Sequence, residues 1–285
     1  MSHILIAGLG DLGAGLARAL LADGHRLSGI RRGPQAPEGV QLYRQDLLEG
    51  PLALPSEPVD LLAVIMTPSE YSESGYRRAY LQAPARLLAA LAQRQPLPPV
   101  LFVSSTAVFG EVQGEVGEDT PAQPGRYNGQ VMLAAERQIS ASAPATAVRF
   151  SGIYGPGRLK LLRKVRRIAD GIDPLPEAVW SNRIHRDDCV GLLHHLATRW
   201  LAGDPPPAMV IGTDNRPVSN LDVQRWLARR QGWPFPGKEA EGGGEPTGKR
   251  IHSRYIDDGG YRLRYPDYRS GYGALLDAGL PPGSS

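Results

Sequence analysis

Cysteine is almost absent from this 285-residue sequence, and the single Cys189 excludes an internal disulfide and any zinc site built from several cysteines. Long apolar runs are also missing. The longest reach only six residues, as at 61–66, whereas a helix that crosses a bilayer needs about 20 apolar residues. No basic leader with a cleavage site precedes the first apolar run at 4–7, so we expect a cytoplasmic protein that makes no contact with membranes.

Charge of one sign does not dominate. The formal net charge is +3, charged residues make up 21% of the chain, and acids and bases are interspersed, so the composition does not predict nucleic-acid binding. Basic residues do gather at 158–167, but no aromatic side chains lie between them. We interpret this stretch as a solvated helix face, with docking of an anionic substrate as the alternative.

Short apolar runs alternate with stretches of helical periodicity over the first two-thirds of the chain. This pattern predicts an α/β fold, a Rossmann-type doubly wound parallel sheet, with a small C-terminal substrate lobe. The predicted strands cover 3–7, 26–30, 40–43, 59–66, 99–104, 146–150 and 208–211, and the clearest helices cover 12–22, 76–93 and 129–139. We predict a nucleotide-binding domain of residues 1–155 and 185–213, and a substrate lobe of residues 156–184 and 214–285.

A glycine-rich turn joins the first predicted strand to the first helix, where residues 8–13 read G-L-G-D-L-G. In a dinucleotide site the first glycine allows the tight turn, the second lets the backbone approach a pyrophosphate, and the third lets helix and strand pack. The helix N-terminus attracts the anion. A purely structural turn is the alternative. The predicted cofactor-binding residues here are Gly8, Gly10, Asp11, Leu12 and Gly13.

The end of the second predicted strand carries Arg31 and Arg32, where an NAD-binding fold usually has an acidic residue for the ribose hydroxyls. A guanidinium cannot accept those hydrogens, but it can pair with a 2'-phosphate. The sequence therefore predicts NADP(H) in preference to NAD(H), and two solvated arginines are the alternative. Asp46 is predicted to contact the adenine side, unless it caps a short helix.

Five further motifs follow in order along the chain. They are S-S-T-A-V-F-G at 104–110, R-F-S-G-I-Y-G-P-G-R at 149–158, N-R-I-H-R-D-D at 182–188, R-P-V-S-N at 216–220 and Y-P-D-Y-R at 265–269. Together they make nearly the whole chain resemble the extended short-chain dehydrogenases/reductases, the epimerase and dehydratase superfamily. The resemblance implies a Rossmann domain with a small substrate lobe, and a homodimer formed through the two long helices.

The resemblance also implies a catalytic set, in which Ser or Thr hydrogen-bonds the substrate oxygen and a Y-x-x-x-K pair transfers the proton. Aligning the 104–110 motif puts the serine role on Ser105, with Thr106 beside it, although a serine at a strand end often only satisfies the backbone. Arg183 and His185 correspond to a segment that borders the substrate pocket. His185 is a candidate for proton transfer, with a buried histidine bonded to backbone as the alternative.

The lysine of this catalytic set is missing. Residues 127–136 read Y-N-G-Q-V-M-L-A-A-E, so the pair falls either on Tyr127 and Val131 or on Asn128 and Met132. The first lysine in the sequence is Lys160, so no small shift of the alignment supplies one. The chain is therefore similar to the atypical members of the superfamily. Ala7 also replaces the first glycine of the G-x-x-G-x-x-G motif that is common among extended members.

The missing lysine bears on the direction of reaction. A tyrosine with a pKa of about 10 is roughly 0.1% ionised at pH 7, which makes it a poor base but leaves it able to donate a proton. We therefore predict a reductive or epimerase-like reaction with Tyr127 as the candidate proton donor, and a surface tyrosine at a helix start as the alternative.

These features together predict an NADP(H)-dependent oxidoreductase or epimerase/dehydratase-like enzyme that acts on a small or sugar-like carbonyl or hydroxyl compound. The alternative is a non-catalytic NADP(H)-binding sensor or regulatory protein. No metal site is expected, because the adjacent His194 and His195 point to different sides of a helix and no i, i+4 histidine pair exists. The expected partner is a small-molecule substrate, with no nucleic acid and no membrane.

Overall fold

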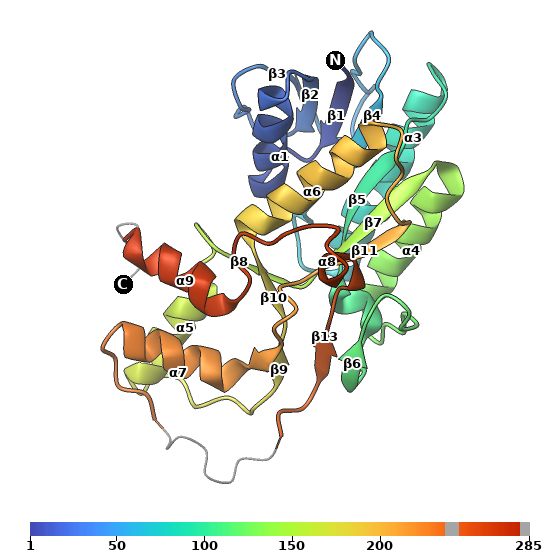
Figure 1. Cartoon of the computed structure of the whole chain (residues 1–285). Coiled ribbons are helices and arrows are strands. Elements are labelled where there is room, and N and C mark those ends of the chain that lie inside the picture. The colour runs from blue at the N-terminus through green and yellow to red at the C-terminus, as the bar shows by residue number, and fades with distance from the viewer. Residues whose placement is uncertain (237–244, 280–285) are drawn as a thin grey trace. The chain divides into compact units, whose positions relative to one another are not determined.

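A computed structural model describes residues 1–236 and 245–279 (Figure 1). The remaining residues of the predicted substrate lobe, 237–244 and 280–285, lie outside the described part. The chain divides into two compact units. The first unit contains 1–110, 121–150 and 189–210, and the second contains 111–120, 151–188 and the described residues from 211 onward.

A seven-stranded sheet forms the centre of the fold and confirms the predicted α/β class. Its strand order is β11-β7-β5-β4-β1-β2-β3, and the pairs from β7 to β3 are parallel. The strands are β1 (His3–Ala7), β2 (Arg26–Arg31), β3 (Val40–Arg44), β4 (Leu61–Val64), β5 (Val100–Ser105), β7 (Ala145–Phe150) and β11 (Met209–Gly212). Every residue of β1 and β4 is buried, as expected for central strands covered on both faces. The chain reverses its direction across the sheet at β1, and such a point is where α/β sheets bind their ligands.

Helices of the first unit flank this sheet. They are α1 (Asp11–Ala22), α2 (Glu73–Arg77), α3 (Ala83–Ala92), α4 (Tyr127–Ser142) and α6 (Arg186–Leu201), the last of which begins in the second unit, with a short 3-10 helix η2 (Thr106–Phe109). The helix predicted over 76–93 is interrupted by a π-helical turn, η1 (Arg78–Gln82). Pro84 explains the interruption, because it has no N–H to donate to the preceding turn.

Short strand pairs and helices make up the second unit. The strands are β6 (Gly114–Val116), β8 (Gly152–Tyr154), β9 (Trp180–Ser181), β10 (Arg183–His185), β12 (Val218–Ser219) and β13 (Lys249–Ile251). The helices are α5 (Lys160–Ala169), α7 (Asn220–Arg230), α8 (Arg254–Asp257) and α9 (Tyr268–Asp277). An apolar cluster with Tyr154, Val165, Leu227 and Tyr272 forms its core.

Residues 111–120 group with the second unit, whereas the predicted boundaries placed them in the nucleotide-binding domain. The physical reason is the parallel pairing of β6 with β13, which joins segments about 135 residues apart. Within the described ranges, no helix combines the length and the apolar character needed to cross a bilayer.

Candidate functional site

The turn after β1 needs two of its three glycines for the fold itself. Gly8 has a φ of +103°, and a Cβ there would lie 2.1 Å from the Ile65 carbonyl oxygen. A Cβ at Gly13 would lie 2.1 Å from the Gly8 carbonyl oxygen. Both positions therefore exclude a side chain whether or not a ligand is present.

Gly10 differs from its two neighbours. Its φ of −79° suits any residue, and a Cβ there would have no atom within 4 Å. The described protein atoms give no reason for glycine at this position, whereas a ligand that approaches the backbone closely would. Gly10 is the N-cap of α1, so the open space lies at a helix N-terminus that attracts anions. These observations fit a bound pyrophosphate.

The other two residues predicted in this turn have different environments. Leu12 is only 6% exposed, so its side chain belongs to the core and only its backbone faces the turn. Asp11 is exposed at the first position of α1, where an acid is favourable towards the helix dipole. Neither side chain is arranged to hold a phosphate.

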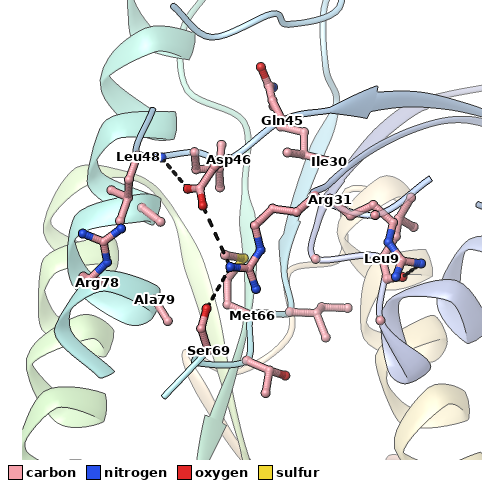
Figure 2. Close-up of a pocket in the computed structure, with 18 of the residues that line it drawn as sticks. Leu9, Ile30, Arg31, Gln45, Asp46, Leu48, Met66, Ser69, Arg78 and Ala79 are labelled. Atoms are coloured by element: carbon pink, nitrogen blue, oxygen red, sulfur yellow. Dashed lines mark hydrogen bonds and ion pairs between the residues drawn. The ribbon is translucent and has the colours of Figure 1, made fainter. Parts of the chain in front are cut away.

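A cavity of about 590 Å³ lies over the carboxyl ends of β1 to β4 (Figure 2). Its walls come from 8–10 after β1, 30–33 at the end of β2, 45–48 after β3 and residues between 65 and 83 that follow β4. This is the edge of the sheet, beside the strand at which the order reverses, where Rossmann folds hold dinucleotides. Of the predicted cofactor residues, Gly8, Gly10, Arg31, Arg32 and Asp46 line it.

Arg31 and Arg32 both border the cavity but have different partners. Arg31 donates from Nη1 to the carbonyl oxygens of Leu9, at 3.0 Å, and Gln35, at 2.7 Å. Arg32 donates from Nη1 to Ser69 Oγ at 2.8 Å, and its side chain is 61% exposed. The Arg32 guanidinium is thus available to an incoming anion, whereas the Arg31 guanidinium bridges two backbone segments.

Asp46 has the capping role considered from the sequence, and its contact with the adenine side stays a prediction. Its Oδ1 accepts the Leu48 N–H at 2.9 Å, which caps the turn after β3. Its Oδ2, on the Asp46 side chain labelled in Figure 2, lies 4.0 Å from Nη1 of Arg32, which also lines the cavity. The carboxylate therefore stabilises the turn, and Asp46 also lines the cavity.

Ser105 ends β5 and caps η2. Its Oγ accepts the Ala107 N–H at 3.1 Å, so the hydroxyl hydrogen remains to be donated elsewhere. Thr106 is 8% exposed and lies in the first position of η2. Neither residue lines the cavity over β1 to β4, and a catalytic role for them stays a prediction.

Tyr127 is the first residue of α4, and its hydroxyl donates to the Tyr71 carbonyl oxygen at 2.9 Å. Its ring lies edge-on to Tyr76, with centroids 5.5 Å apart, and Tyr76 in turn contacts Tyr80. Burial raises the pKa of Tyr76 and of Tyr80, so both stay protonated. Sequence reasoning missed this cluster, although the spacing of 76 and 80 places both on one helical face.

The position of the missing lysine is apolar and closed. Val131 and Met132, the two alternatives from the sequence, are each 3% exposed. The first turn of α4 packs tightly on η2, since a Cβ at Gly129 would lie 2.4 Å from the Ala107 carbonyl oxygen. The region next to Ser105 therefore holds hydroxyl groups but, among the described residues of α4, no amine.

His185 belongs to the second unit, whereas Ser105, Thr106 and Tyr127 belong to the first. It is 3% exposed, its Nδ1 accepts the Asp187 N–H at 3.2 Å, and its ring lies 4.0 Å from that of Tyr265. Burial lowers the pKa of His185, so the ring is neutral near pH 7. These contacts are those of the buried, backbone-bonded alternative.

A buried ion pair in the first unit was also not predicted from the sequence. Arg149 donates two hydrogen bonds to Glu136, at 3.0 and 2.7 Å, and both side chains are 9% exposed. Ser104 donates to the same carboxylate, and the Arg149 guanidinium lies 5.0 Å from the Phe109 ring centre. Motif residues from β5, η2, α4 and β7 thus form one structural network. No cluster of metal-ligating side chains occurs in the described residues.

Comparison with known proteins gives consistent results. A family model for the NAD dependent epimerase/dehydratase family matches residues 4–212. Protein YeeZ of Escherichia coli K12 is 35% identical over 171 residues, which are 55% of this chain but only 61% of YeeZ, less than two-thirds of its length.

Two solved structures show the same architecture over almost the whole chain. A proposed NAD-dependent epimerase/dehydratase from Methylobacillus flagellatus is 37% identical, with a TM-score of 0.80, and the match covers 97% of this chain and 98% of that one. UDP-glucuronic acid 4-epimerase from Bacillus cereus, solved in complex with NAD, is 20% identical, with a TM-score of 0.74 and 96% of each chain covered. The second likeness concerns the fold alone.

Proposed function

The chain belongs to the NAD dependent epimerase/dehydratase family, and we propose that it is an NADP(H)-dependent oxidoreductase or epimerase/dehydratase-like enzyme. Its substrate in this proposal is a small or sugar-like compound that carries a carbonyl or hydroxyl group. The observation that carries the proposal is the cavity over the carboxyl ends of β1 to β4. Gly10 leaves open space there at the N-terminus of α1, and Arg32 occupies the position where an NAD-binding fold has an acidic residue.

The residues that line this cavity fit the adenosine half and the pyrophosphate of a dinucleotide. The backbone of the Gly8–Gly13 turn would hold the pyrophosphate, Asp46 and its neighbours would border the adenine, and Arg32 would meet the 2'-phosphate. The Bacillus cereus epimerase, which has the same fold, was solved in complex with NAD, and this supports a pyridine nucleotide as the ligand. The preference for the phosphorylated form is our inference from the charge of Arg32.

On the substrate side, we assign two roles to hydroxyl groups. Ser105 Oγ, already oriented by the Ala107 N–H, donates its hydrogen to the substrate oxygen. Tyr127 transfers its phenolic proton to that oxygen and gives up its bond to the Tyr71 carbonyl. The cofactor, when bound, supplies or accepts the hydride. Because no lysine keeps this tyrosine ionised at neutral pH, it starts as an acid, which suits reduction of a carbonyl better than oxidation of an alcohol.

Turnover of carbonyl compounds with NADPH tests this proposal. We expect the purified protein to consume NADPH with at least one small or sugar-like ketone or aldehyde. Ser105→Ala should lower kcat/KM by about 10²-fold and Tyr127→Phe by about 10²-fold or more, since each loses a donor to the reacting oxygen. NADPH affinity should be unchanged in both variants.

Tyr43→Phe is a matched control, because Tyr43 lies on the edge strand β3, four strands away from β5. Its kcat/KM should equal that of the parent. Tight NADPH binding without turnover over a broad panel of carbonyl compounds would contradict the enzyme proposal and support a binding role instead.

A further inference from the structure

Three arginines line the cavity over β1 to β4, and they are not equivalent. Arg31 ends β2, Arg32 follows it, and Arg78 begins the π-helical turn η1 that follows β4. Two acids, Asp46 and Glu70, line the same cavity, so its walls carry one more positive than negative charge. The sequence motifs singled out Arg31 and Arg32 but gave no role to Arg78.

Nη1 of Arg31 is already engaged with the backbone. Its Nη1 joins the Leu9 carbonyl, inside the glycine turn, to the Gln35 carbonyl in the loop after β2. Figure 2 shows its side chain running to Leu9 and its hydrogen bond to the carbonyl there. Both hydrogens of Nη1 are used in this way, so the guanidinium could not turn away from the glycine turn without losing two charge-assisted bonds to carbonyls. Its position suits a residue that holds the glycine turn in shape.

The side chains of Arg32 and Arg78 have no such hydrogen bonds to backbone carbonyls within the described ranges. Arg32 bonds to one neutral hydroxyl, that of Ser69, and its carboxylate neighbour Asp46 is 4.0 Å away. The Arg78 side chain is exposed and has no hydrogen bond or ion pair with any residue in the described ranges, and Figure 2 shows it on the helical side of the cavity. A 2'-phosphate carries close to two negative charges at neutral pH, more than one guanidinium neutralises.

We propose that Arg32 and Arg78 together recognise the 2'-phosphate of NADP(H), and that Arg31 is a positioning residue that holds the glycine turn for any pyridine nucleotide. This inference rests on the proposed function, because it assumes that the cavity takes a pyridine nucleotide. It adds a specificity-determining residue from the segment after β4 and separates the two adjacent arginines by role.

Calorimetric titration of NADPH and NADH into four variants tests the division of roles. Arg32→Ala and Arg78→Ala should each weaken NADPH binding by about tenfold or more while changing NADH binding by less than about threefold, since only NADPH carries the extra phosphate. Arg31→Ala should weaken both nucleotides by a similar factor. Arg77→Ala is the matched control, because Arg77 is exposed and adjacent to Arg78 but does not line the cavity. It should bind both nucleotides as the parent does.

The outcomes separate this inference from the function on which it rests. A parent protein that binds neither nucleotide, or binds NADH as tightly as NADPH, would refute the proposed cofactor itself. A parent that prefers NADPH, with Arg78→Ala no different from Arg77→Ala, would refute the present inference alone. A selective loss of NADPH in Arg31→Ala, or no loss of either nucleotide there, would also contradict it.

Discussion

The three glycines of the turn after β1 differ in what their presence indicates. A Cβ at Gly8 or at Gly13 would lie 2.1 Å from a backbone oxygen, so the protein's own packing requires glycine at both positions. Gly10 faces open space and has an ordinary backbone conformation. Only the middle glycine therefore carries information about a ligand, because the other two would be needed in an empty turn as well.

A buried acid in the second unit gives a prediction for pH dependence. Asp214 is 3% exposed, its Oδ1 accepts the Arg216 N–H, and burial raises the pKa of its carboxyl to about 7. The folded state therefore holds a proton that the unfolded state releases above about pH 4. The contribution of Asp214 to stability is present at low pH and is lost as pH rises from about 4 to about 7.

Denaturant unfolding of the parent and of Asp214→Asn between pH 4 and 8 measures this contribution. The free energy of unfolding of the parent, relative to the variant, should fall by up to about 1.4 kcal/mol per pH unit through that window and level off above pH 7. A difference between the two proteins that does not change with pH would contradict the assignment.

Among the elements of the first unit, the Glu136–Arg149 pair connects α4 to β7, and Ser104 connects β5 to the same carboxylate. Removing one member of a buried pair leaves an uncompensated charge, at a cost of about 3–5 kcal/mol. We expect Glu136→Leu or Arg149→Met alone to lower the free energy of unfolding by about this amount.

The double variant Glu136→Leu, Arg149→Met provides the control for that prediction, because it removes both charges together. Its loss of stability, measured by urea unfolding, should be well below the sum of the two single losses. Strict additivity would show that the two side chains do not interact. The family motifs that contain these residues therefore serve the fold at these positions.

At the scale of the whole molecule, the sheet was predictable because its signals are local. Apolar runs such as 3–7 and 61–64 are buried strands, and the G-L-G-D-L-G turn follows β1 at the edge where the cavity lies. The order of motifs along the chain placed Ser105 at the end of β5 in the same way.

Features that depend on distant contacts were not predictable. The pairing of β6 with β13 joins 114–116 to 249–251, and the sequence around 114 contains no signal for it. The different roles of Arg31 and Arg32 depend on where the Leu9, Gln35 and Ser69 oxygens lie in the folded chain. The roles of two adjacent arginines could therefore not be distinguished before the positions of these oxygens were known.

The central claim is that the open space at Gly10 receives a nucleotide pyrophosphate. Calorimetric titration of NADPH into the parent and into Gly10→Ala tests it most directly, with the melting temperature of each free protein measured alongside. The account predicts NADPH binding by the parent, at least about tenfold weaker binding by Gly10→Ala, and a stability change within about 1 kcal/mol. Equal NADPH affinity in the two proteins, or no binding by the parent, would contradict it.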